Sequence, residues 1–203
     1  MYQRKEASEV DVYQVLMPSY VEKAHNLVSC DVRYIPNVVP DIPQDSCADL
    51  QADKIMHTIL HIGRVEPNRK RQLILIEAFS KIAHEFPDWQ VHYYGPVTDA
   101  AYKRKIDEFV HNNQLEDQVL YKGVADNCID VLKTGDIFAF PSSAEGFPLA
   151  LTEAMGGGLP AIGFYDAASV NELIHDNKNG YLCSDLAEFT EKLRTLRKDK
   201  EKR

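Results

Sequence analysis

The stretch of residues 137–153 has the sequence Ile137-Phe138-Ala139-Phe140-Pro141-Ser142-Ser143-Ala144-Glu145-Gly146-Phe147-Pro148-Leu149-Ala150-Leu151-Thr152-Glu153. Its first four residues form a short apolar run, which is typical of a buried strand. Polar residues and a glycine follow. Pro148 then stands near the first turn of an expected helix, where proline is favoured. The stretch therefore predicts a strand, a loop and a helix in direct succession.

The same alternation continues on both sides of this stretch. Strands are predicted at 57–62, 90–95, 119–122, 136–140, 160–164 and 180–183, and helices near 70–86, 99–113, 126–134, 148–156, 168–175 and 185–197. Strands that alternate with helices form βαβ units with right-handed crossovers. We therefore expect an α/β fold with a parallel sheet and helices on both faces. Ligands should bind just beyond the carboxyl ends of its strands.

The N-terminal quarter of the chain has a different character. Strands are predicted at 12–17 and 32–35, with a helix over 19–28 that Ser19 and Glu22 would close as a capping box. Prolines and polar residues make 36–53 a linker by composition.

Bulk composition excludes several classes of protein. The formal net charge of -8 argues against general nucleic-acid binding, which needs a basic surface. No apolar run reaches the about 18 residues of a membrane span, and the first residues do not resemble a signal peptide. The four cysteines show no CxxC or metal-ligand spacing, which favours reduced residues in a cytoplasmic protein.

Two loops are candidates for binding an anion. Gly63-Arg64 follows a predicted strand, and Lys70 stands where the next helix opens, so cations and backbone N–H groups could meet a phosphate there. A solvated basic loop would have the same composition. The second candidate is the loop that ends at Pro148, again before a helix N-terminus.

Glu145 and Glu153 are too far apart along the chain to form a close acid–base dyad on one helical face. They suit two separate hydroxyl acceptors on a polyhydroxyl ligand with a phosphate between them. Taken singly, Glu145 also suits a carboxylate that opposes the helix dipole, and Glu153 suits an exposed helix position.

The sequence lacks the motifs of several other kinds of functional site. None of the seven histidines forms an HxH or HExxH pair, and His61 and His92 fall on predicted strands, where a packing role is expected. There is no GxSxG elbow and no GxGxxG loop. The sequence thus predicts no metal site, no serine nucleophile and no dinucleotide cofactor.

Taken together, these segments resemble the retaining GT-B glycosyltransferases of family 4, also called the group 1 glycosyltransferases. Glu145 and Glu153 match the Glu-x7-Glu signature of that family. The other matching segments are Gly63-Arg64 with Lys70, Asn171-Glu172-Leu173-Ile174, Asn179-Gly180-Tyr181-Leu182 and Ile35-Pro36-Asn37-Val38. Two residues depart from the pattern, because Pro148 and Val38 stand where many members have glycine.

The resemblance implies two Rossmann-like domains, with the sugar donor bound mainly to the C-terminal one. By analogy, Arg64 and Lys70 would neutralise the leaving diphosphate without a metal or other cofactor. Glu145 would hold hydroxyls of the transferred sugar, and Glu153 would hold the ribose. The remaining donor-binding positions would be Val124 and Ala125 at the base, and Gly63, Gly146, Phe147, Pro148 and Leu149 around the phosphates and sugar.

On this resemblance, residues 54–197 are expected to form the nucleotide-sugar-binding domain, the C-terminal half of a GT-B fold. Residues 1–53 would be a remnant of the N-terminal domain with the interdomain linker, and 198–203 a tail. The chain alone would be an inactive fragment that binds a UDP- or GDP-sugar and lacks its acceptor domain or partner subunit.

The full enzyme would transfer a sugar to a glycan or lipid-linked acceptor in surface polysaccharide synthesis, in the cytoplasm or at the inner face of the membrane. Two alternatives remain at this point. One is a non-catalytic nucleotide-sugar-binding subunit. The other is a different GT-B enzyme such as an epimerase, although the acid–base set that an epimerase needs is not evident in the sequence.

Overall fold

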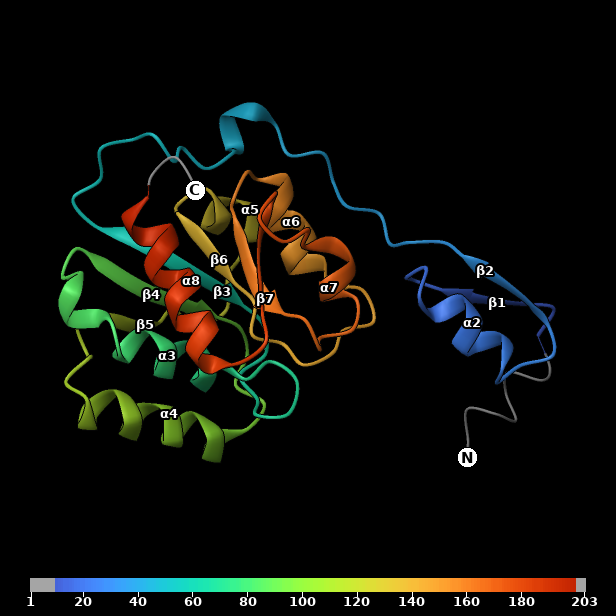
Figure 1. Cartoon of the computed structure of the whole chain (residues 1–203), viewed down its shortest axis with the longest axis horizontal. Helices are drawn as coiled ribbons and strands as arrows, with labels where there is room; N and C mark the ends of the chain where they lie inside the picture. The colour runs from blue at the N-terminus through green and yellow to red at the C-terminus, as the bar shows by residue number, and fades with distance from the viewer. Residues whose placement is uncertain (1–9, 200–203) are drawn as a thin grey trace.

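The computed structural model describes residues 10–199, which form a large α/β body and a small N-terminal unit (Figure 1). Within these residues the large body contains one six-stranded parallel sheet in the order β5-β4-β3-β6-β7-β8. Its strands are β3 (His57–Ile62), β4 (Trp89–Tyr94), β5 (Val119–Tyr121), β6 (Ile137–Ala139), β7 (Ala161–Phe164) and β8 (Gly180–Cys183). Every pairing in this sheet is parallel, as the alternating pattern predicts.

Helices cover both faces of the sheet (Figure 1). The helical elements after β3 are α3 (Gln72–Ser80), η2 (Ala83–Glu85), α4 (Ala100–Asn112), α5 (Cys128–Leu132), α6 (Leu149–Gly156), α7 (Val170–Leu173) and α8 (Leu186–Lys198). α3 packs against α8 on one face, and α5 packs against α6 on the other. The strand order reverses direction between β3 and β6. In open parallel sheets such a switch point is where ligands bind.

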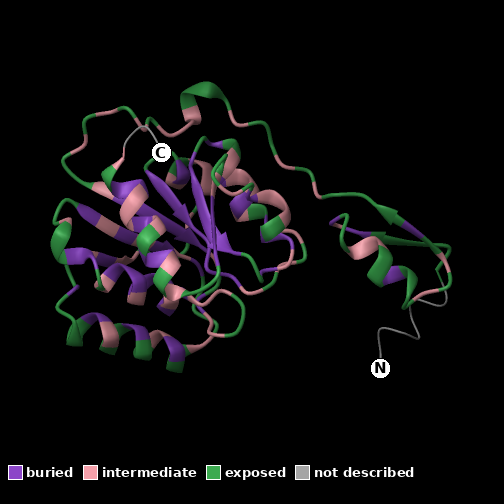
Figure 2. Ribbon diagram, viewed as in Figure 1, coloured by how far each residue is buried: buried purple, intermediate pink, exposed green. Residues whose placement is uncertain are grey.

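The apolar run over residues 137–140 lies at the centre of the core. Ile137, Phe138, Ala139 and Phe140 are all fully buried. Figure 2 shows buried residues concentrated on the central strands and on the inner faces of the helices. A strand with helices on both faces has no solvent side, which explains why its sequence does not alternate.

The N-terminal unit is a single βαβ motif that consists of β1 (Val12–Val15), α2 (Tyr20–His25) and β2 (Asp31–Tyr34), with parallel strands. Its buried core is small and consists of Val15, Ala24 and Val32. An extended segment with one turn of 3-10 helix, η1 (Gln44–Ser46), leads from this unit to the large body. It is tied there by the Ala48 N–H, which donates to the Gly157 carbonyl at 2.9 Å.

Several predicted helix boundaries were wrong, and backbone geometry explains the larger errors. The helix predicted over 70–86 begins only at Gln72, because Arg71 has left-handed backbone angles (φ 49, ψ 42), and it breaks after Ser80. The helix predicted over 168–175 spans only Val170–Leu173, since Ser169 has φ 70. Pro148 is the residue before α6 rather than part of its first turn.

The capping box predicted at Ser19 and Glu22 was also wrong. Ser19 has helical backbone angles and its side chain makes no capping hydrogen bond within α2. Its hydroxyl instead donates to the Glu172 carboxylate on α7. The helix itself ends at His25, three residues before the predicted end at 28.

Candidate functional site

The candidate site lies at the switch point, where the loops after β3 and β6 meet. These loops are fastened to each other by backbone and side-chain bonds. The Ser143 N–H donates to the Arg69 carbonyl at 2.9 Å, and the Ser143 hydroxyl donates to the Asn68 carbonyl at 3.0 Å. The Arg71 Nε donates to the Pro141 carbonyl at 2.7 Å. Two segments about 75 residues apart in the sequence therefore form one rim of the sheet.

A cleft of about 270 Å³ opens at this rim. It is lined by Ile62, Gly63, Arg64, Lys70, Phe140, Glu145, Phe147, Pro148, Leu149 and Ala150. The structure thus brings together most of the residues that the sequence singled out. It does not bring Gly146, Val124, Ala125 or Glu153 into the same cleft.

Lys70 and Glu145 face each other across the cleft. The Lys70 Nζ lies 2.5 Å from the Glu145 Oε1, and the two side chains are only 14% and 12% exposed. The ammonium also lies 5.2 Å from the centre of the Phe140 ring. A pair this well shielded from water is screened less than a surface ion pair, so removal of one partner would leave an uncompensated charge.

Arg64 offers a second cation at the same cleft. It is exposed, and its guanidinium has no hydrogen-bond or ionic partner among residues 10–199. A guanidinium is well suited to phosphate because it can donate two parallel hydrogen bonds. The cleft therefore combines one unpaired cation with one that is paired internally.

The backbone at Gly63 lies in close contact with other parts of the chain. A Cβ at Gly63 would lie 3.2 Å from the Cδ of Lys70, so the lysine stem crosses directly over this glycine. Gly95, at the end of β4, has φ +136, and a Cβ there would lie 2.1 Å from the Gly63 carbonyl oxygen. Both glycines are therefore sites of close approach within the protein itself.

A buried network supports the Arg64 backbone. His61 is fully buried, and its Nδ1 lies 2.9 Å from the Ala139 carbonyl, so this nitrogen carries the proton. The opposite nitrogen accepts from the Gln72 amide at 3.2 Å, and the same amide donates to the Arg64 carbonyl at 2.7 Å. Burial lowers the pKa of His61 to about 4, since the Ala139 bond, which raises it, is outweighed and nearby Lys70 lowers it further. The packing role expected for this histidine is confirmed.

The loop before α6 presents backbone N–H groups to the cleft. The Leu149 N–H is already used, because it donates to the Phe147 carbonyl at 3.0 Å. The Phe147 N–H has no partner among residues 10–199. Pro148 has no N–H to offer. Of the amides expected to meet a ligand here, the one at Phe147 is therefore available and the one at Leu149 is not.

Glu153 lies away from this cleft, on the side of α6 that packs towards α5. Burial raises the pKa of its carboxyl group. Burial also raises the pKa of the Cys128 thiol at the start of α5, and the Glu153 charge adds to that rise. The carboxylate accepts no hydrogen bond from any described residue. Val124 is 65% exposed and follows Gly123, whose φ is +76. Glu145 and Glu153 thus lie in different surroundings and do not form an acid–base dyad.

Sequence reasoning missed several residues around Glu145. The Tyr20 hydroxyl donates to the Glu145 carbonyl at 2.5 Å, and the buried Ser169 hydroxyl donates to the same oxygen at 2.7 Å. No local pattern could have indicated these contacts, because Tyr20 is 125 residues from Glu145 and Ser169 is 24 residues from it.

Comparison with known proteins identifies the family. The family model described as "Glycosyl transferases group 1" matches residues 56–199, which include the whole six-stranded sheet and the cleft. The chain belongs to this family. The Rossmann-like α/β fold expected from the resemblance to GT-B glycosyltransferases is therefore confirmed, and the family is one of sugar-transferring enzymes.

Three relatives illustrate the likeness. The chain is 27% identical over 192 residues to the UDP-N-acetylglucosamine–peptide N-acetylglucosaminyltransferase GtfA subunit of Streptococcus pneumoniae, covering 94% of this chain and 37% of that protein. A crystal structure of TarM from S. aureus, in a complex that includes UDP, has 24% identity and a TM-score of 0.86, covering 99% of this chain and 40% of that one. The C-terminal domain of LpcC from Francisella tularensis has 24% identity and a TM-score of 0.67, covering 81% of this chain and 86% of that one.

The chain spans less than half the length of the first curated relatives it matches, namely 42%, 37% and 46% of them. Within residues 10–199, no helix has both the length and the apolar character needed to cross a membrane. The same residues contain no cluster of three or more His, Cys, Asp or Glu side chains that could hold a metal ion.

Proposed function

We propose that this chain is the donor-binding half of a retaining GT-B glycosyltransferase of family 4, and that it binds a UDP- or GDP-sugar. The observation that carries the proposal is the cleft at the switch point, where Arg64, Lys70 and Glu145 converge beside the start of α6. Residues 54–197 would form the donor-binding domain. Residues 1–53 would belong to the N-terminal domain and the linker.

The diphosphate of the donor would bind to Arg64 and Lys70. Arg64 is free to form a two-pronged contact, whereas Lys70 would exchange its internal partner Glu145 for a phosphate oxygen. The Phe147 N–H and the positive end of α6 would add to this attraction. Since opposite charges lower the free energy of a departing diphosphate, both cations would act mainly in the transition state.

The sugar and the nucleoside would be held by separate carboxylates. Glu145, released from Lys70, would accept hydrogen bonds from hydroxyls of the transferred sugar, next to Gly63 and Gly146. Glu153 would accept them from the ribose, and its lack of a protein partner supports that role. Val124 and Ala125, in the exposed loop after β5, would meet the base through their backbone.

The remaining features of the enzyme are also proposals. A UDP donor is favoured because UDP is a bound molecule in the TarM and pneumococcal GtfA structures. An acceptor domain or partner subunit would complete the cleft, and the GtfA/B complex offers a precedent for a partner. The complete enzyme would act in the cytoplasm or at the inner face of the membrane, on a glycan or lipid-linked acceptor of a surface polysaccharide. No metal or other cofactor would be required.

Isothermal titration calorimetry with UDP, GDP and their sugar conjugates tests this proposal. We expect one nucleotide to bind, and Arg64→Ala and Lys70→Ala each to weaken it by about tenfold or more, since a hydrogen bond to a charged group contributes about 1.5–3 kcal/mol. Arg104→Ala is the matched control, because Arg104 is an exposed arginine on α4 and does not line the cleft. Absence of binding to either nucleotide at millimolar concentration would refute the proposal.

A further inference from the structure

We infer that Tyr20 and Ser169 are positioning residues that fix the backbone of Glu145 for recognition of the donor sugar. This inference rests on the proposed function and adds a role for the N-terminal unit in the same site. Tyr20 lies in the first turn of α2, and Ser169 immediately precedes α7. The two residues approach Glu145 from elements far apart in the sequence.

Two hydroxyl groups and one carbonyl form a closed triangle at this point. The Tyr20 and Ser169 hydroxyls lie 2.7 Å apart, at 2.5 Å and 2.7 Å respectively from the Glu145 carbonyl oxygen. Ser169 also reaches the Gly146 carbonyl at 3.3 Å. Two hydroxyl protons serve these contacts, so when both hydroxyls donate to the Glu145 carbonyl and fill its two lone pairs, neither donates to the other hydroxyl or to Gly146. The peptide after Glu145 is therefore held from two sides.

The burial and the backbone angles of Ser169 indicate a specific role for its hydroxyl group. It is fully buried and has φ 70, which is unfavourable for any residue with a Cβ. Glycine would adopt this backbone without strain but would lack the hydroxyl. Backbone strain of this kind is concentrated at sites where the surrounding structure uses it. Here the strained backbone aims the hydroxyl at the Glu145–Gly146 loop.

A second contact fixes α2 against the same region. The Glu172 carboxylate, in α7, accepts from the Ser19 N–H at 3.2 Å and from the Ser19 hydroxyl at 2.5 Å. Ser19 and Tyr20, at the start of α2, therefore contact Glu172 and Ser169 respectively. Because the N-terminal unit has a small core of its own, such contacts decide where α2 lies relative to the cleft.

The triangle matters most when a sugar nucleotide is bound. Without a ligand, Glu145 is held at both ends, by Lys70 at its carboxylate and by the triangle at its carbonyl. Once Lys70 turns to the diphosphate, the carboxylate loses its protein partner. The backbone contacts then become the anchor that keeps Glu145 at the sugar. A nucleotide without a sugar does not use Glu145 and should not depend on this anchor.

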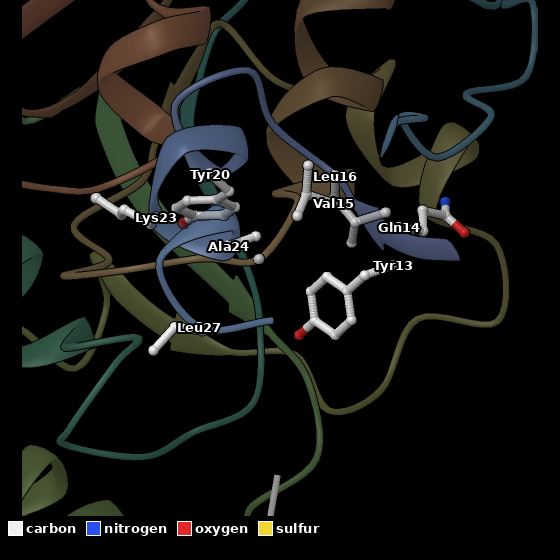
Figure 3. Close-up of a pocket in the computed structure, with 9 residues that line it drawn as sticks. Tyr13, Gln14, Val15, Leu16, Tyr20, Lys23, Ala24 and Leu27 are labelled. Atoms are coloured by element: carbon white, nitrogen blue, oxygen red, sulfur yellow. The ribbon is translucent and has the colours of Figure 1, made fainter. Parts of the chain in front are cut away.

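The surroundings of Tyr20 allow its hydroxyl to be removed alone. Its ring lines a pocket of about 310 Å³ together with Tyr13 and Leu27, and Figure 3 shows these side chains arranged around the pocket from β1, α2 and the turn after α2. Tyr20→Phe keeps this apolar wall and deletes only the hydroxyl. Tyr13→Phe makes the same chemical change in the same pocket, where the hydroxyl has no hydrogen-bond partner among residues 10–199.

The test is calorimetry on the full chain with UDP, UDP-N-acetylglucosamine, UDP-glucose, GDP and GDP-mannose. Tyr20→Phe should raise the Kd of the preferred sugar nucleotide about three- to tenfold, the range for one hydrogen bond, and leave the Kd of the bare nucleotide within about twofold. Tyr13→Phe should leave both unchanged. Hydrogen exchange should be faster at residues 144–147 in Tyr20→Phe only. If Tyr20→Phe fails to fold, Ser169→Gly is expected to show the same selective rise in the Kd of the sugar nucleotide.

The outcomes separate this inference from the proposed function. If the unaltered chain binds neither UDP nor GDP, the proposed function fails and the inference fails with it. If it binds a sugar nucleotide and Tyr20→Phe has no effect, or weakens bare and sugar-bearing nucleotides equally, the inference alone is overturned. Selective weakening of the sugar nucleotide supports both.

Discussion

At the scale of single residues, Glu145 and Glu153 differ in what surrounds them. Glu145 is paired with Lys70 inside the cleft, whereas Glu153 lies towards α5, and burial raises the pKa of its carboxyl group. The Glu-x7-Glu spacing predicted that the two carboxylates contact separate parts of one ligand. The pairing with Lys70 was not evident from the sequence, because the two residues are 75 positions apart.

These surroundings predict different effects of the two alanine substitutions. Glu153→Ala should weaken UDP about tenfold, because the ribose hydroxyls lose their acceptor. Glu145→Ala should leave the affinity for UDP unchanged or higher, since Lys70 is then free for phosphate, and should weaken only the sugar nucleotide. Titration of both variants with both ligands measures this division. Equal losses for both ligands in Glu145→Ala, or unchanged affinity for UDP in Glu153→Ala, would contradict it.

His61 predicts how stability depends on pH. Its pKa is about 4 in the folded protein against 6.5 for an unperturbed histidine, so the unfolded chain binds a proton first as the pH falls. Stability does not depend on His61 ionisation above about pH 6.5, decreases below it, and is lower by about 3 kcal/mol at pH 4.

Denaturant unfolding between pH 7.5 and 4 measures this dependence, with His61→Asn as the variant that can still donate to a carbonyl but cannot ionise. The slope of stability against pH should be smaller in His61→Asn. His175→Asn, a change at an exposed position, should keep the slope of the unaltered chain. Identical slopes in all three proteins would show that His61 does not titrate as stated.

At the scale of elements, the succession of short apolar runs and helical patterns was enough to predict every strand of the large sheet. The boundaries of α3 and α7 were missed for one physical reason. Arg71 and Ser169 occupy positive φ, which a residue with a side chain adopts only when tertiary contacts favour it. Arg71 donates to the Pro141 carbonyl and Ser169 to the Glu145 carbonyl, and both partners are distant in sequence.

The close approach of β3 and β4 predicts that Gly95 cannot be replaced. Gly95→Ala would place a Cβ 2.1 Å from the Gly63 carbonyl at a φ of +136. The free energy of unfolding should fall by about 2 kcal/mol or more. Gly146→Ala is the matched control, because a Cβ there meets nothing within 4 Å. Chemical denaturation compares the two, and similar stability for both would contradict the packing described.

At the scale of the whole molecule, the switch point between β3 and β6 explains why residues from separate loops meet in one cleft. The parallel order places the carboxyl ends of both strands at one edge, so the sequence could predict the edge without the distances. What it could not predict is that α2 reaches across to Glu145. That contact depends on how the N-terminal unit lies against the large body, which no local pattern encodes.

Hydrogen exchange of the full chain, measured with and without UDP, tests whether the donor binds in this cleft. We predict slower exchange in the segments 63–70 and 146–153 when UDP is bound, with no change in α4, which lies away from the cleft. Slower exchange confined to other segments, or none at saturating UDP and GDP, would contradict donor binding in this cleft.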